Sequence, residues 1–179
     1  MEKLKSLGFD TSCFLTTITS GELTHQHLQK RNDPWFAALG RKCIHITWGD
    51  RGAISLEGLG LQVVNNVDDA EFILAHGTLA AKYESLGGEV KWMGKPDKVI
   101  YTSAMSLAGV DAHECIMVGD SLHHDIKGAN APGIASAFIT GGIHSDELGL
   151  VETAGEDAIN SLCSKHGSYP SYVLPSFTW

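Results

Sequence analysis

The sequence has 179 residues, of which 43% are hydrophobic, and this is enough for one globular domain or for a core domain with a small insert. Its 13 basic and 21 acidic side chains give a formal charge of -8, which argues against a nucleic-acid partner because such proteins carry a basic face. No apolar run approaches the ~18 residues of a membrane span, and the first residues lack the apolar core of a signal peptide, so we expect a cytoplasmic protein without a membrane partner.

Short strands alternating with helices are predicted along the chain. MEKLKSLGF predicts a first helix that ends near Gly8, and the sequence TSGE predicts a helix start at Thr19. Pro34 and Pro96 each suit a first helical turn, and Gly109 suits a helix end. Six apolar runs have the length and the β-branched or aromatic content of strands: CFLTTI, CIHIT, FILAH, CIMVG, ASAFIT and SYVL. This alternation predicts an α/β fold.

Two aspartates follow CIMVG in the segment IMVGDSLHHDIKGANAPGIASAFIT. Asp120 is predicted at the carboxyl end of a buried strand, where ligands bind in open α/β sheets. Asp125 is predicted at the N-cap of the helix IKGANA. A strand-end carboxylate beside a polar loop suits a hard cation such as Mg²⁺, which prefers one or two carboxylates with waters and a substrate phosphate. The alternative is that Asp120 is only a turn residue and Asp125 only a helix cap.

Lys95 lies upstream in the segment MGKPDKVIY, in a turn that opens a predicted helix. A lysine ammonium at this place can neutralise a phosphate as a compact charge, and a nearby aspartate can hold it in position. The alternative is a solvated lysine beside a helix start.

Together, GKPDKVIY and IMVGDSLHHDIKGANAPGIASAFIT resemble the third and fourth motifs of the haloacid dehalogenase-like (HAD) hydrolases. The flanking segments ITSGELT, HGT, KYESLGGEVKWMGKP and ITGGIH resemble the subclass IIA members, which are phosphatase-like proteins with a large α/β cap. The resemblance covers nearly the whole chain. It implies a Rossmann-like, three-layer α/β/α core with an α/β cap insert.

The resemblance also implies a reaction. In the family, an aspartate at the end of the first strand attacks a phosphomonoester, and water then hydrolyses the aspartyl-phosphate, with a second aspartate as general acid and base. Asp120 corresponds to the Mg²⁺ ligand of the fourth motif. Asp125 would support the metal's waters and Lys95, and Lys95 would face the phosphate and stabilise its charge. The implied substrate is a small phosphorylated metabolite.

The family's first motif is an apolar strand ending in Asp-x-Asp, and this pattern occurs nowhere in the 179 residues. No nucleophile can therefore be assigned. We predict a partial HAD core with a remnant at residues 1–21, a shortened cap at residues 22–78 and the C-terminal half of the core at residues 79–179. Such a chain would be a truncated isoform, a truncated gene model or a decayed copy, inactive alone. An unpaired strand edge at Cys115–Val118 would favour self-association.

Histidines and cysteines show no metal-binding spacing in the sequence. His25 and His27 are two residues apart on a predicted helix and so point to different faces. We expect His123 and His124 to face solvent, the alternative being contact with a substrate, whereas His144 follows the last core strand and could reach the rim of the pocket. The four cysteines are expected to be reduced core residues: Cys13, Cys43, Cys115 and Cys163.

Three functional classes remain open from the sequence. The first is a Mg²⁺-dependent phosphatase of the HAD type. The second is a non-catalytic or regulatory remnant that binds phosphate or Mg²⁺ weakly through Lys95, Asp120 and Asp125. The third is an unrelated α/β phosphate-binding or receiver-like protein, which would need an acidic cluster at another strand end, and the sequence shows none.

Overall fold

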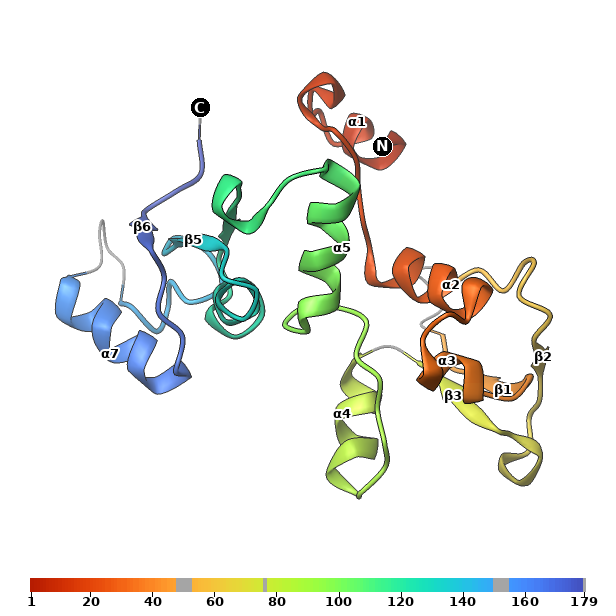
Figure 1. Ribbon diagram of the computed structural model, residues 1–179. Coiled ribbons are helices and arrows are strands. Elements are labelled where there is room, and N and C mark those ends of the chain that lie inside the picture. Colours follow the sequence, from red (N-terminus) through yellow and green to blue (C-terminus); the bar gives the residue numbers. More distant parts are fainter. Residues whose placement is uncertain (48–52, 76, 150–154, 179) are drawn as a thin grey trace. The chain divides into compact units, whose positions relative to one another are not determined.

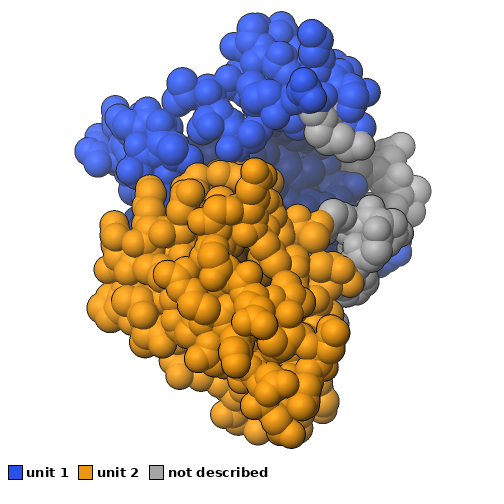
Figure 2. Space-filling model, turned by 90° about the vertical axis from the view of Figure 1, so that its right-hand side faces the viewer, with its two compact units in different colours: residues 1–17, 94–179 blue, residues 18–93 orange. Residues whose placement is uncertain are grey.

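The computed structural model describes residues 1–47, 53–75, 77–149 and 155–178, and these form a mixed α/β structure with two parallel sheets (Figure 1). The chain separates into two compact units, one formed by residues 1–17 with 94–179 and the other by residues 18–93 (Figure 2). The assignment of these units to a HAD core and a cap, with the predicted boundaries at 22 and 79, stays a prediction. No helix in the described ranges has the length and apolarity needed to cross a bilayer.

The first unit is built around a parallel sheet with the strand order β4-β5-β6. Val118 of β4 pairs with Ala137 of β5, and Phe138 of β5 pairs with Val173 of β6. Because parallel neighbours need crossover connections, helices lie between successive strands. In chain order the elements are α1 (Glu2–Ser6), η1 (Thr11–Cys13), α5 (Lys98–Ala108), η3 (Ala112–Glu114), β4 (Ile116–Gly119), the π-helical turn η4 (Leu122–Ile126), α6 (Lys127–Asn130), β5 (Ala135–Ile139), α7 (Glu156–His166) and β6 (Tyr172–Leu174).

One face of this sheet carries helices α5, α6 and α7. Met117 pairs with Ser136, and because strand side chains alternate, Met117 and Phe138 lie on the same face. Two buried clusters join this face to the helices: Leu122, Ile126, Phe138, Leu148, Leu162 and Cys163 in one, and Tyr101, Ala129 and Ile134, packed with Met117, in the other. The opposite face is less covered, since its alternate side chains remain 40–58% exposed at Ile116, Tyr172 and Leu174.

The second unit contains a smaller parallel sheet in the order β2-β1-β3, in which Cys43 pairs with both Val63 and Phe72. Its elements are α2 (Ser20–Lys30), α3 (Pro34–Ala38), β1 (Lys42–His45), β2 (Gln62–Val63), η2 (Val67–Asp69), β3 (Phe72–Leu74) and α4 (Gly77–Ser85). The side chain of Arg31 donates hydrogen bonds to several carbonyl groups between Leu28 and Gly40, which fixes the turn that follows α2. The buried side chains of this unit include Leu23, Leu28, Phe36, Cys43, Leu59 and Leu74.

Most predicted strands form, as β1, β3, β4, β5 and β6, although the last residue of FILAH, His76, lies outside the described residues. The prediction of a strand at CFLTTI is wrong. Cys13 ends the turn η1, and the segment 14–18 pairs with no strand in the described part of the chain. A strand is stable only when a neighbour satisfies its backbone groups, and local propensity cannot supply one.

The predicted helix ends are mostly confirmed. Thr19 caps α2 by accepting a hydrogen bond from the Glu22 N–H, Pro34 begins α3, and Gly109 ends α5 with a φ of 68°. Pro96 was expected in a first helical turn, but α5 begins two residues later at Lys98, because Asp97 is the residue that caps it.

Candidate functional site

Lys95 and Asp125 form an ion pair in the first unit. The distance from Lys95 Nζ to Asp125 Oδ1 is 2.6 Å, and the side chain of Asp125 is 5% exposed whereas that of Lys95 is 48% exposed. The second oxygen, Asp125 Oδ2, accepts the Ser121 N–H at 3.0 Å. Both carboxylate oxygens therefore have donors, and Asp125 holds a cationic side chain that remains accessible from solvent.

The turn η4 places Asp125 beneath the end of β4. Ser121 is the N-cap of this turn, and its Oγ accepts the His124 N–H at 3.1 Å. The prediction that Asp125 caps a helix is therefore wrong, because the helical turn begins earlier than expected and includes Asp125. A Cβ atom at Gly119 would lie 2.4 Å from the carboxyl carbon of Asp125, so this close approach requires a glycine at the end of the strand.

Asp120 lies directly after β4, as the sequence predicted, and is partly buried. Its Oδ2 accepts the backbone N–H of Ile143 at 3.1 Å, which joins the segment after β4 to the segment after β5. A Cβ atom at Gly142 would lie 2.2 Å from the Cβ of Asp120, so Gly142 also allows this contact. Among the described residues, Asp120 Oδ1 has no hydrogen bond. An anionic oxygen is thus left at the strand end, which is the kind of ligand a hard cation prefers.

Tyr101 of α5 supports the turn η4. Its hydroxyl donates to the carbonyl oxygen of His124 at 2.7 Å, and the side chain is 6% exposed. Burial, together with the negative charge of Asp125, raises the pKa of Tyr101 well above its ordinary value. The phenol therefore stays protonated and fixes the backbone next to Asp125.

The family comparison covers this part of the chain. Residues 92–164 match the family described as HAD-hydrolase-like, a range that includes Lys95, Asp120 and Asp125. This segment is similar to the HAD-like hydrolases. The Lys95–Asp125 ion pair and the strand-end aspartate, Asp120, therefore all lie within the matched segment.

Several curated phosphatases are similar to part of the chain. The dihydroxyacetone phosphatase of Corynebacterium glutamicum is 30% identical over 73 residues, which are 40% of this chain and 26% of that protein. The sugar-phosphatase AraL of Bacillus subtilis is 33% identical over 112 residues, which are 62% of this chain and 37% of that protein. The chain thus spans well under half the length of these relatives.

Solved HAD structures resemble the whole chain in fold. A HAD-like hydrolase from Brucella suis covers 99% of this chain and 78% of its own, with a TM-score of 0.70 and 20% identity. NagD from E. coli covers 98% of this chain and 76% of its own, with a TM-score of 0.60 and 20% identity. The fold class predicted from the sequence, an α/β structure of the HAD type, is confirmed.

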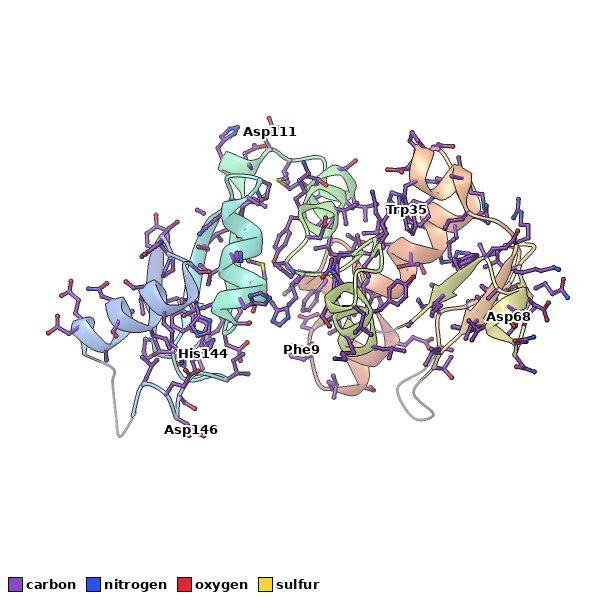
Figure 3. All side chains as sticks on the ribbon, turned by 90° about the horizontal axis from the view of Figure 1, so that it is seen from below. Phe9, Trp35, Asp68, Asp111, His144 and Asp146 are labelled. Carbon is purple, nitrogen blue, oxygen red and sulfur yellow. The ribbon has the colours of Figure 1, made fainter. Side chains whose placement is uncertain are left out.

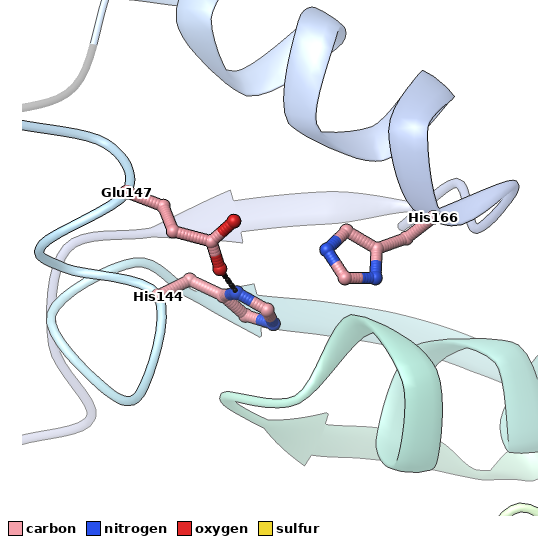
Figure 4. A group of neighbouring side chains, drawn as sticks. All are labelled: His144, Glu147 and His166. Carbon is pink, nitrogen blue, oxygen red and sulfur yellow. Dashed lines mark hydrogen bonds and ion pairs between the residues drawn. The ribbon is translucent and has the colours of Figure 1, made fainter.

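A second group of polar side chains was missed by the sequence reasoning. His144 (Figure 3) and Glu147 belong to the segment after β5, and His166 is the last residue of α7 (Figure 4). Only the spacing of His144 and Glu147 in ITGGIHSDELGL could have suggested the pair, because a histidine and a carboxylate three residues apart can meet across one turn. His166 is brought to them by packing.

The sequence left open that His144 reaches the rim of a pocket, and in the structure its side chain is 6% exposed. Its Nδ1 lies 2.7 Å from Glu147 Oε1, and the Leu122 N–H donates to its Nε2 at 3.4 Å. The Leu122 donor assigns the ring proton to Nδ1, which donates to Glu147. The Lys165 ammonium, 2.6 Å from Glu147 Oε2, and the His144 ring lower the pKa of Glu147 to about 2.

Two of the other histidines have hydrogen-bond partners of their own. His25 Nε2 lies 3.0 Å from the carbonyl oxygen of Glu57, and His124 Nδ1 lies 3.0 Å from Ser121 Oγ. A cavity of about 400 Å³ in the first unit is also separate from Lys95, Asp120 and Asp125. It is lined by Thr140, Glu156, Ile159, Asn160, Val173, Leu174 and Pro175.

Proposed function

We propose that Lys95, Asp120 and Asp125 form the phosphate- and metal-binding part of a HAD-type, Mg²⁺-dependent phosphatase-like site. The observation that carries this proposal is the Lys95–Asp125 ion pair beside a strand-end aspartate with one unpaired oxygen among the described residues. Relatives named dihydroxyacetone phosphatase and sugar-phosphatase support a small phosphorylated metabolite as the substrate class.

Each residue has a distinct part in this proposal. Asp120 Oδ1 would hold Mg²⁺, and the ion when bound would neutralise phosphate charge. Lys95 presents an ammonium group to the phosphate, and Asp125 keeps that group oriented through the 2.6 Å contact. Asp125 Oδ1 holds Lys95 and Oδ2 accepts the Ser121 N–H, so the part of Asp125 in this proposal is to position Lys95 and to support the waters of the metal.

We further propose that this 179-residue chain binds phosphate but does not turn over phosphomonoesters alone. Its sequence contains no Asp-x-Asp, and covalent catalysis needs a carboxylate within reach of phosphorus. Loss of a nucleophile removes several powers of ten in rate, each worth about 1.4 kcal/mol. The alternative to a phosphatase-like site is a regulatory role, in which the same residues only bind phosphate or Mg²⁺ weakly.

Two further proposals concern the cellular location of the protein and its self-association. We place it in the cytoplasm, supported by four free cysteines, of which Cys43 and Cys163 are buried. Self-association is supported by β4, which pairs with β5 alone in the described residues and leaves its other edge without a strand partner.

Binding is tested by isothermal titration calorimetry with Mg²⁺, in the absence and presence of inorganic phosphate. Asp120→Asn is expected to abolish Mg²⁺ binding, because a neutral amide replaces the anionic ligand. The matched control is Asp157→Asn, an exposed aspartate of α7 in the same unit, which should bind like the wild type. Unchanged binding in Asp120→Asn would show that the metal site is elsewhere.

Turnover is tested with a generic aryl phosphate and Mg²⁺. The wild-type chain should release no aryl alcohol above the uncatalysed rate, while Lys95→Ala should weaken phosphate binding in the calorimeter. Activity in the wild type that is lost in Lys95→Ala would contradict the non-catalytic proposal and would mean that another carboxylate makes the attack.

A further inference from the structure

We propose that His144, Glu147 and His166 bind a divalent transition-metal ion of the Zn²⁺ type, at a site separate from Asp120. One ligand atom from each of the three side chains lies within 4.8 Å of the other two. The three residues come from two segments of the first unit, the loop after β5 and the end of α7.

The nitrogen Nε2 of His166 is the strongest observation. It is buried and has no hydrogen-bond partner among the described residues. Figure 4 shows a ring nitrogen of His166 facing His144 and Glu147, and the two histidine rings are 5.0 Å apart between centroids. A buried polar atom without a partner is unfavourable, and an imidazole lone pair is a common metal donor. An ion would supply the missing partner.

The ligand types select the class of metal. Two imidazole nitrogens and one carboxylate oxygen are a ligand set of Zn²⁺, which leaves a fourth position for water. Mg²⁺ prefers oxygen ligands alone, so this cluster and Asp120 differ in the ion they favour. The Lys165 ammonium holds Glu147 Oε2, which leaves Oε1 directed at His144.

Small movements would complete the coordination. His144 Nδ1 and Glu147 Oε1 are 2.7 Å apart and share one proton. Ligands of a tetrahedral ion stand roughly 3.3 Å apart, given metal distances of about 2.0–2.2 Å, so this pair must separate slightly while His166 approaches. The ring proton of His144 then moves to Nε2, and the 3.4 Å hydrogen bond from Leu122 is given up.

The test uses the intact chain and two metal probes at neutral pH. Zn²⁺ affinity is measured by competition with a chromophoric chelator, and Co²⁺ is followed by its visible absorption. We expect one ion per chain, with Co²⁺ bands of a four- or five-coordinate site and without the near-ultraviolet band of a thiolate ligand. His166→Gln should weaken Zn²⁺ binding by at least about 100-fold, since loss of an outer-shell partner alone typically costs 10- to 100-fold.

Two controls distinguish this site from a metal bound elsewhere in the chain and from a loss of folding. His113→Gln removes an exposed histidine of the same unit and should leave Zn²⁺ affinity unchanged, and Asp120→Asn should retain Zn²⁺ binding. Because His166 Nε2 has no hydrogen bond to lose among the described residues, His166→Gln should unfold at the wild-type midpoint without metal, while only the wild type is stabilised by added Zn²⁺.

The proposal would be overturned by an absence of Zn²⁺ binding in the wild type, by equal affinity in His166→Gln, or by loss of binding in Asp120→Asn. A thiolate band with Co²⁺ would likewise assign the ion to a cysteine.

Discussion

The Lys95–Asp125 pair and the His144–Glu147–His166 cluster belong to the same unit, yet they differ in whether their buried polar atoms have hydrogen-bond partners. Both oxygens of Asp125 have donors within the protein, and its cation is half exposed. In the second group, His166 Nε2 is buried without a partner among the described residues. The first group is thus complete as a structural unit and presents charge outward, whereas the second lacks one interaction. Substitutions that disturb one group and leave the other intact can test this difference.

The largest expected effect is at Phe138, which packs against the second group. Phe138 is fully buried, contacts the His144 ring at 5.9 Å between centroids, and packs with Leu162 and Cys163 of α7. Phe138→Ala should lower the free energy of unfolding by about 3–5 kcal/mol, because it leaves a cavity. Phe138→Leu, which keeps most of the volume, should cost less than about 1.5 kcal/mol. Urea unfolding measures the free energy of unfolding of both variants. Equal losses in the two would contradict the cavity argument, because they would show that the surrounding side chains fill the space left by Phe138→Ala.

Gly119→Ala should disturb the first group alone. The added Cβ would meet the carboxyl group of Asp125 at 2.4 Å, and we expect a loss of about 1–3 kcal/mol in the free energy of unfolding. Gly21→Ala is the control, because the nearest atom to its Cβ position is Ile54 Cγ1 at 3.6 Å, and within α2 it should leave the free energy of unfolding unchanged or raise it by up to about 1 kcal/mol. Chemical denaturation measures the free energy of unfolding of both variants. An unchanged value in Gly119→Ala would mean that the Asp125 side chain can move away from the added Cβ at no cost.

Tyr101→Phe should have a smaller effect, about 0.5–1.5 kcal/mol, because it removes the hydrogen bond to the His124 carbonyl. It should also change the pH dependence. Burial holds the pKa of Tyr101 above its ordinary value of 10.0, so the unfolded chain loses this proton first as the pH rises. Wild-type stability therefore falls as the pH rises above about 10, and Tyr101→Phe should show a shallower fall. Parallel slopes in the two proteins would contradict a protonated, buried phenol.

Lys165→Met should have the smallest effect, because Lys165 and Glu147 are both largely exposed. The pKa of Glu147 is lowered to about 2 from the ordinary value of 4.5, with Lys165 as the main cause. This interaction stabilises the fold above pH 4.5 and is lost as the pH falls toward 2. In metal-free Lys165→Met the pKa of Glu147 should rise, which an NMR titration of its carboxyl carbon measures. Lys127→Met, another exposed lysine of the unit, should leave that pKa unchanged.

Local patterns predicted more of the fold than of the sites. Most strands were found from apolar runs, whereas CFLTTI failed because a strand depends on a partner that local sequence cannot specify. The roles of Asp120 and Lys95 were proposed from short motifs, and the structure places Lys95 against Asp125. The His166 contact could not be predicted, because it depends on how α7 packs on Phe138 and Leu122.

The backbone between Gly142 and His144 connects the two proposed metal sites. Ile143 donates its N–H to Asp120, while the next residue, His144, bonds to Glu147. An ion bound at the proposed His144 site would move His144 and, with it, the neighbouring donor that holds Asp120. By linkage, whatever factor Zn²⁺ imposed on Mg²⁺ affinity, Mg²⁺ would impose on Zn²⁺ affinity. If both proposed sites bind metal, the occupancy of each would then depend on both metal concentrations.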